Sequence, residues 1–60
     1  MRRDLRTRIL RFRGQNRMSQ KAFAKACGVH ENTIYKVEAG GYIRPVTELK
    51  ILDFLEANNG

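Results

Sequence analysis

The sequence predicts a small all-α domain built from four helices. Three observations support this fold class: apolar residues recur at helical spacing in several segments, glycines and one proline separate those segments, and no stretch alternates between apolar and polar residues as a strand would. The chain of 60 residues is expected to form one domain, residues 1–60. A domain of this length buries only about 60% of its unfolded surface, so we expect a small core and modest stability.

Two short helices joined by a tight turn are predicted at about residues 19–40. Ser19 can cap the first helix, because its hydroxyl can accept a hydrogen bond from a free amide of the first turn. Gly28 is expected to end that helix, since glycine adopts a positive φ without a Cβ penalty. The second helix begins near residue 31, turns Ile34 inward and ends at the glycine pair of residues 40–41. Its outward side chains are those of Glu31, Asn32, Tyr35 and Lys36.

The N-terminal segment is predicted to form a helix from about Arg3 to Arg13. Its apolar residues recur at i, i+4 and i+7 and are Leu5, Ile9 and Phe12. We expect this helix to end at residues 14–16, Gly-Gln-Asn. Leu10 lies off the apolar stripe, so it is either a lone surface leucine or a contact with a partner.

A fourth helix is predicted from about Val46 to Ala57, after a loop in which Ile43 is expected to reach the core. Five of the seven residues at positions 49–55 are apolar, namely Leu49, Ile51, Leu52, Phe54 and Leu55. Such an arc is too wide for one face of a helix. We therefore expect one side to cover the core and the other to contact a second subunit.

The positive charge of the chain is concentrated at its N-terminus. The chain carries 12 Lys and Arg residues against 6 Asp and Glu, a formal net charge of +6. Residues 1–17 hold seven arginines and a single acid, whereas residues 18–60 carry equal numbers of bases and acids. The arginines are Arg2, Arg3, Arg6, Arg8, Arg11, Arg13 and Arg17. This surplus indicates a polyanionic partner, although each arginine has two interpretations, a solvated side chain or a phosphate contact.

The sequence disfavours enzymes, metal proteins and membrane proteins. Cys27 is the only cysteine and His30 the only histidine, so neither an intramolecular disulfide nor a metal site is expected. Cys27 is predicted to be a small buried hydrophobe in a reducing compartment. No stretch approaches the roughly 18 apolar residues of a membrane span, and the arginine-rich start lacks the apolar core of a secretion signal. We expect a cytoplasmic protein with no cofactor, catalytic group or small-molecule ligand.

The central segment carries the pattern Q-x3-A-x3-G-x5-I-x3-E-x-G. Its residues are Gln20, Ala24, Gly28, Ile34, Glu38 and Gly40. The pattern resembles the helix-turn-helix of the phage repressor and Cro family, also called the Xre family, over about Ile9 to Leu55. The resemblance implies a lambda-repressor-like domain in which Ala24 lets the helices approach, Gly28 makes the turn and Ile34 wedges the second helix onto the first.

The resemblance also implies which residues meet DNA. Residues expected at base edges, where an α-helix fits the major groove, are Glu31, Asn32, Thr33, Tyr35 and Lys36. Residues expected at phosphates are Arg17, Ser19, Gln20, His30 and Arg44. For His30 two interpretations stay open, because imidazole is a poorer N-cap than serine or threonine: either the second helix starts loosely or His30 serves a phosphate.

Proteins of this kind commonly pair an arginine of the first helix with a glutamate at the end of the second helix of the motif. Here the matching residues are Arg13 and Glu38. In a partly dry space the guanidinium would donate two bonds to the carboxylate and fix the angle of the reading helix. The alternative is a pair of solvated charges, which contributes only about 0–1 kcal/mol.

Two functions from different classes are consistent with these observations. The first is a sequence-specific DNA-binding regulator, a repressor of phage, plasmid or bacterial origin that binds double-stranded DNA as a homodimer on two half-sites. The second is a helix-turn-helix used for protein interaction, as in an antitoxin or adaptor, or an arginine-rich RNA binder that uses residues 1–17.

Overall fold

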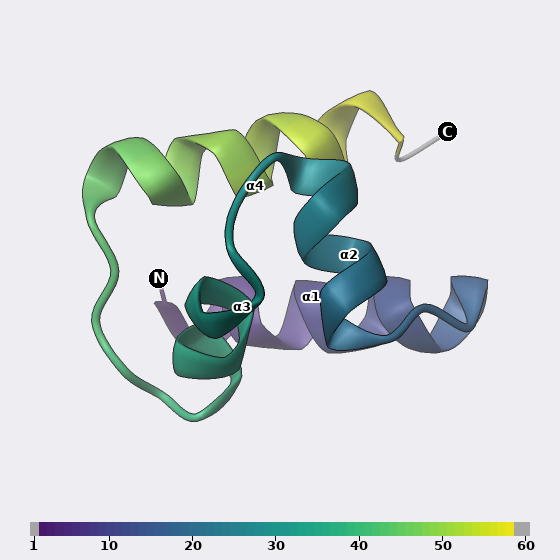
Figure 1. The fold of residues 1–60 in the computed structure, drawn as a ribbon, viewed down its shortest axis with the longest axis horizontal. Helices are drawn as coiled ribbons and strands as arrows, with labels where there is room; N and C mark the ends of the chain where they lie inside the picture. The colour runs from purple at the N-terminus through teal and green to yellow at the C-terminus, as the bar shows by residue number, and fades with distance from the viewer. Residues whose placement is uncertain (1, 59–60) are drawn as a thin grey trace.

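The computed structural model describes residues 2–58, with side chains from Leu5 onward, and these residues form four helices and no strand. The helices are α1 (Arg2–Asn16), α2 (Gln20–Cys27), α3 (Glu31–Glu38) and α4 (Pro45–Ala57). In Figure 1, α1 and α4 lie on opposite sides of the molecule, and α2 and α3 lie between them. The all-α class and the predicted positions of α2, α3 and α4 are confirmed. The side chains of Arg2, Arg3 and Asp4, which contribute to the predicted N-terminal charge, lie outside the described residues.

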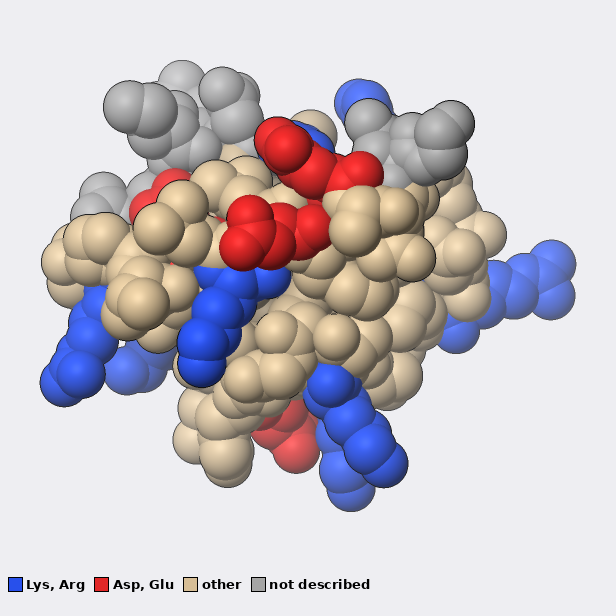
Figure 2. Space-filling model, turned by 90° about the horizontal axis from the view of Figure 1, so that it is seen from above, with Lys and Arg blue, Asp and Glu red and all other residues tan. Residues whose placement is uncertain are grey.

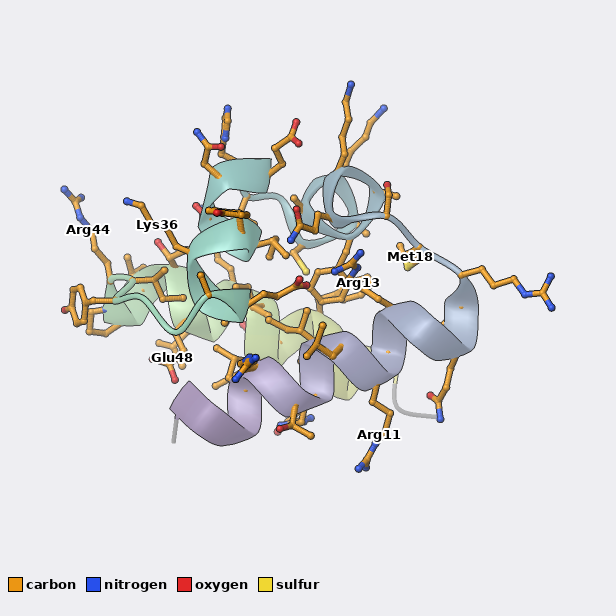
Figure 3. The ribbon with its side chains drawn as sticks, turned by 90° about the horizontal axis from the view of Figure 1, so that it is seen from below. Arg11, Arg13, Met18, Lys36, Arg44 and Glu48 are labelled. Atoms are coloured by element: carbon orange, nitrogen blue, oxygen red, sulfur yellow. The ribbon has the colours of Figure 1, made fainter. Side chains whose placement is uncertain are left out.

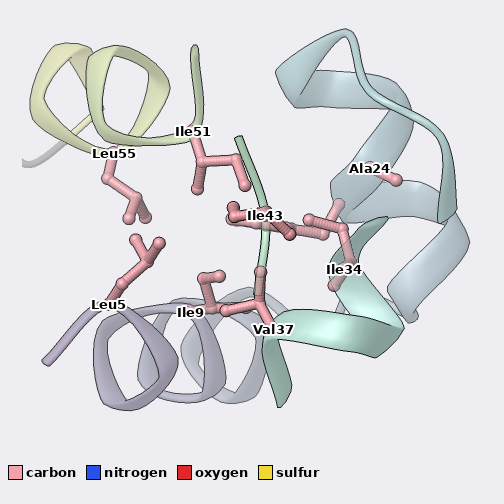
Figure 4. Close-up of a cluster of buried hydrophobic side chains, with 9 residues drawn as sticks. Leu5, Ile9, Ala24, Ile34, Val37, Ile43, Ile51 and Leu55 are labelled. Atoms are coloured by element: carbon pink, nitrogen blue, oxygen red, sulfur yellow. The ribbon is translucent and has the colours of Figure 1, made fainter. Parts of the chain in front are cut away.

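The core is formed by apolar side chains from all four helices and from the loop before α4. Its buried residues are Leu5, Ile9, Phe23, Ala24, Ile34, Val37, Ile43, Ile51 and Leu55. Figure 4 shows these side chains converging from opposite walls, with α1 and α4 facing each other and Ile43 between them. Ile43 is buried as predicted, and it fastens the loop between α3 and α4 to the centre of the domain.

Three phenylalanines from three helices form an aromatic cluster beside this core. Phe12 of α1, Phe23 of α2 and Phe54 of α4 meet edge to face, with ring centroids 5.3–5.7 Å apart. Leu52 also packs partly buried against the core. Four of the five apolar residues at positions 49–55 therefore pack within the domain, and only Leu49 stays exposed. Contact of the other side of α4 with a second subunit stays a prediction.

The outer face of α4 keeps only a small apolar patch. Val46 is 60% exposed and Leu49 is 58% exposed. Further along the same face the exposed residues are acidic, Asp53 and Glu56. Leu10 of α1 is also exposed, so the structure leaves both interpretations of that residue open.

Helix α1 ends later than the sequence predicts. Residues 14–16 remain helical, and the chain leaves the helix at Arg17, which has a left-handed φ of 53°. The amide of Met18 donates to the carbonyl of Arg13 over 2.9 Å, which closes the last turn. A Cβ on Gly14 would meet nothing within 4 Å, so no contact requires glycine there. The helix thus continues past Arg13 through the segment predicted to end it, because the left-handed residue that closes it is Arg17 and not Gly14.

Candidate nucleic-acid interface

The turn between α2 and α3 is built by local hydrogen bonds. At the start of α2, the Ser19 hydroxyl accepts a bond from the amide of Ala22 over 3.0 Å. At its end, Gly28 has a φ of 79°, and the amide of Val29 donates to the carbonyl of Ala24 over 3.0 Å. These bonds satisfy amide and carbonyl groups at both ends of the helix, and the chain is free to begin α3 two residues later.

His30 caps the start of α3. Its Nδ1 accepts a hydrogen bond from the backbone amide of Asn32 over 3.0 Å. Because Nδ1 is the acceptor, the neutral ring carries its proton on Nε2, which remains a free donor. The imidazole therefore caps α3, so the interpretation that this helix starts loosely is wrong. The other interpretation, that His30 contacts a phosphate, remains a prediction.

Helix α3 divides into a buried face and an exposed face. Ile34 and Val37 are buried against the core. The side chains of Glu31, Asn32, Tyr35 and Lys36 are exposed. Tyr35 is 62% exposed, so its ring is available for a partner and takes little part in the packing of the domain. The polar face predicted from the sequence is thus presented to solvent on a helix that the core holds in place.

Glu38, the last residue of α3, joins three helices. Its Oε2 accepts from Nη1 of Arg13 in α1 over 2.5 Å, and its Oε1 accepts from Nε2 of Gln20 in α2 over 2.9 Å. Nε of Arg13 donates in turn to the carbonyl of Met18 over 3.0 Å. The contact that the resemblance implies between Arg13 and Glu38 is present, and it is largely shielded, since the two side chains are 22% and 12% exposed. The guanidinium therefore donates one hydrogen bond to the carboxylate of Glu38 and one to the backbone carbonyl of Met18, and not two to the carboxylate as expected.

A hollow of about 400 Å³ opens between α3, the following loop and the start of α4. We term it the loop hollow; its lining residues are Thr33, Lys36, Tyr42, Ile43, Arg44 and Thr47. Arg44 is the N-cap of α4 and makes no side-chain cap bond, and Pro45 occupies the first turn. Figure 3 shows Lys36 and Arg44 extending on the same side of α3. The loop hollow therefore combines two cations with a helix N-terminus, an arrangement that suits a phosphate.

Thr33 belongs to this hollow and lies away from the centre of the exposed face. It is half-buried, and it lines the hollow together with Arg44 and Thr47. A sequence pattern alone puts Thr33 beside Asn32 and does not show which edge of the helix borders the loop. The structure thus groups this predicted base-contact residue with the candidate phosphate residues.

The remaining candidate phosphate residues lie near the start of α2. Arg17 and Ser19 are exposed, and the hydroxyl of Ser19 already serves as the cap. Gln20 is half-buried, and its side-chain amide donates to Glu38. The sequence patterns did not reveal this second role of Gln20, because the partner lies 18 residues further along the chain.

A second hollow, of about 390 Å³, lies on the side of α3 that faces α2. We term it the α2–α3 hollow; its lining residues are Lys21, Ala24, Lys25, Val29, His30 and Glu31. The sequence-based prediction did not include Lys21 and Lys25. The available signal was their spacing of four residues, which places both lysines on one side of α2.

Acidic and basic side chains are unevenly distributed over the surface. Figure 2 views the molecule from the side of α4, where several acidic side chains gather in the upper middle of the face and most of the Lys and Arg side chains extend outward around them. In Figure 3, Arg11 of α1 points away from the side where Lys36 and Arg44 extend. Lys36 and Arg44 therefore accompany the exposed face of α3, whereas Arg11 does not.

Other kinds of site find little support within the described residues. Among the side chains that the structure describes, those of residues 5–58, no three His, Cys, Asp or Glu residues lie close enough together to hold a metal ion. The helices of the same part of the chain are too short or too polar to cross a bilayer. Burial raises the pKa of the half-buried Cys27 thiol from 9.0 to about 11, which keeps it protonated and unreactive at neutral pH.

Comparison with known proteins gives one match. A family model described as "Helix-turn-helix" matches residues 9–57, which is most of the chain and includes α2, α3 and α4 in full. No curated protein and no solved structure matches the chain.

Proposed function

Because the chain belongs to the Cro/C1-type, Xre-like helix-turn-helix family of DNA-binding domains, we propose that it is a sequence-specific transcriptional regulator. Its role would be that of a Cro-like repressor of phage, plasmid or bacterial origin, acting in the cytoplasm by occupying promoter DNA. The observation that carries the proposal is the division of α3, which is held by buried residues on one side and leaves Asn32 and Lys36 exposed on the other.

The exposed side chains of α3 have the chemistry to read base edges in the major groove. The amide of Asn32 can donate to and accept from adenine at N6 and N7, and Lys36 can donate to guanine at O6 or N7. The carboxylate of Glu31 can accept from cytosine N4. Tyr35 lies within this exposed face and Thr33 at its edge beside the loop hollow, and both are proposed as additional contacts.

Phosphate contacts would orient α3 without reading sequence. Arg44 is the main candidate, since it lines the loop hollow with Lys36 at the start of α4. Ser19 and Gln20 stand at the N-terminus of α2, where the helix dipole favours an anion. Arg17 precedes them on the surface, and His30 offers its free Nε2 donor.

We propose that two copies bind adjacent half-sites through the small apolar patch of α4, Val46 and Leu49. At about 25 cal/mol per Å², the free energy gained by burying one such side chain corresponds to only about 60–120 Å² of buried apolar surface. Two such patches together therefore bury far less than the roughly 1,200–2,000 Å² of a stable interface. The area supports a protein that is monomeric alone and pairs only when DNA aligns two copies about one helical turn apart.

The arginine-rich α1 supports a second candidate, because Arg11 points away from the exposed face of α3. An RNA or an acidic protein bound there would leave α3 unused. This candidate and the leading one differ in which part of the surface carries the binding.

One experiment separates these functions: binding of the protein to duplex DNA from its own upstream region and to an RNA of equal length, measured across a salt series. We expect preference for the duplex, with log affinity falling against log salt by about 0.9 for each phosphate neutralised. Preference for the RNA would support the second candidate. Binding that does not respond to salt would contradict any nucleic-acid function.

A further inference from the structure

The α2–α3 hollow has features of a phosphate site that the helix-turn-helix pattern does not assign. Its two lysines come from adjacent turns of α2 and are both exposed. Within residues 5–58, neither Lys21 nor Lys25 forms an ion pair or a side-chain hydrogen bond. Two ammonium groups without partners beside one hollow favour an anionic ligand.

His30 adds a directed donor to the same hollow. Its Nδ1 is occupied by the amide of Asn32, so the proton of the neutral ring is on Nε2. The ring lines the hollow with the two lysines, over apolar walls formed by Ala24 and Val29. Because of this capping bond, the neutral imidazole can donate a hydrogen bond from Nε2 without carrying a positive charge.

The position of this hollow relative to α3 indicates what the anion is. The loop hollow is bordered by Thr33, and the α2–α3 hollow by Glu31. These residues are two positions apart, which is about 200° around a helix with 3.6 residues per turn. The two cationic hollows consequently lie on opposite edges of α3. A helix in the major groove, about 12 Å wide, has a row of phosphates on each side, one from each strand.

We propose that the α2–α3 hollow binds a backbone phosphate of the DNA strand opposite to the one held by Arg44. Lys21 and Lys25 supply the charge, and His30 supplies a hydrogen bond from Nε2. The inference rests on the proposed DNA-binding function and extends it, since it assigns one phosphate site to each edge of α3. Glu31 is the one acid that lines the hollow, and its carboxylate repels a phosphate bound there. This repulsion weakens binding to any duplex that offers no matching base pair to the carboxylate.

The test is a salt series with the double variant Lys21→Gln/Lys25→Gln on a duplex carrying the preferred site and on an unrelated duplex. We expect weaker binding to both duplexes by the same factor, and a log–log slope shallower by about 0.9, the change for one phosphate contact. Lys50→Gln is the matched control, because Lys50 is an exposed lysine of α4 that lines neither hollow. It should retain the wild-type slope.

His30→Asn tests the imidazole separately. Asparagine is a strong N-cap, so this variant keeps the start of α3 and removes the Nε2 donor. We expect unchanged or higher thermal stability, with weaker binding to both duplexes alike. A change in the preferred sequence would overturn the phosphate role of His30.

The outcomes distinguish the inference from the function on which it rests. If the wild-type protein binds duplex DNA and the double lysine variant retains the slope of the Lys50→Gln control, the hollow holds no phosphate and the inference is overturned while the function stands. If the wild-type protein shows no salt-dependent binding to duplex DNA, both are overturned.

Discussion

At the N-terminal end of α3, Asn32 is exposed and its side chain forms no hydrogen bond with the described residues, whereas at the C-terminal end Glu38 accepts two hydrogen bonds and is 12% exposed. The two residues are less than two turns apart on one helix. The comparison shows how a short helix serves two purposes. Its last residue ties it to α1 and α2, and its first turn is left free to contact a partner. Loss of Glu38 should therefore change the stability of the domain, and loss of Asn32 should change only what it binds.

The largest effect expected from this difference follows Glu38→Ala. The substitution strands the Arg13 guanidinium and the Gln20 amide in a partly dry space. We expect a loss of about 3 kcal/mol in the free energy of unfolding, at the low end for a buried pair because both side chains keep some exposure. For a domain of this size that is roughly 12–24 °C in melting temperature.

Two further variants make the Glu38 prediction specific. Glu56→Gln, on the exposed face of α4, is the matched control and should stay within about 0.5 kcal/mol of the wild type. The double variant Arg13→Met/Glu38→Leu should recover much of the loss, because it replaces both charges with apolar side chains. A single Glu38 variant that melts within a degree or two of the wild type would show that the pair does not stabilise the fold.

A smaller change in the opposite direction tests whether stability and DNA binding are separable. Gly14 is helical and exposed, and a Cβ there would meet no atom within 4 Å. Gly14→Ala should raise the free energy of unfolding by about 0.5–1 kcal/mol, since glycine costs that much relative to alanine inside a helix. Urea unfolding measures the gain, and affinity for DNA should be unchanged. Altered DNA affinity in this variant would mean that the end of α1 takes part in binding.

Much of the fold could be predicted from the sequence because its determinants are local. The spacing of Leu5, Ile9 and Phe12 marks the inner face of α1, and Ser19 and Gly28 mark the ends of α2. The contact between Arg13 and Glu38 followed from the family resemblance, since no local rule links residues 25 positions apart.

What the sequence did not predict depends on how the helices are placed relative to one another. Phe54 turns inward because it meets rings from α1 and α2, and a single-helix pattern contains no information on either. Arg17 takes the left-handed conformation usually found at glycine, which no pattern rule assigns to arginine. The two hollows beside α3 likewise arise between elements, so the sequence pattern did not show that Lys21 and Lys25 line one of them and Thr33 the other.

The central claim is that α3 reads sequence while residues around it hold the backbone, and selection of bound sites from random DNA tests it most directly. Wild type, Asn32→Ala and Arg44→Ala are compared at one salt concentration. For Asn32→Ala the account predicts that preference relaxes at one base pair of each half-site, with a loss of about 1–3 kcal/mol for that pair. For Arg44→Ala it predicts the wild-type preference with uniformly weaker binding. The same selected sequence from wild type and Asn32→Ala, or equal loss of preference in both variants, would contradict it.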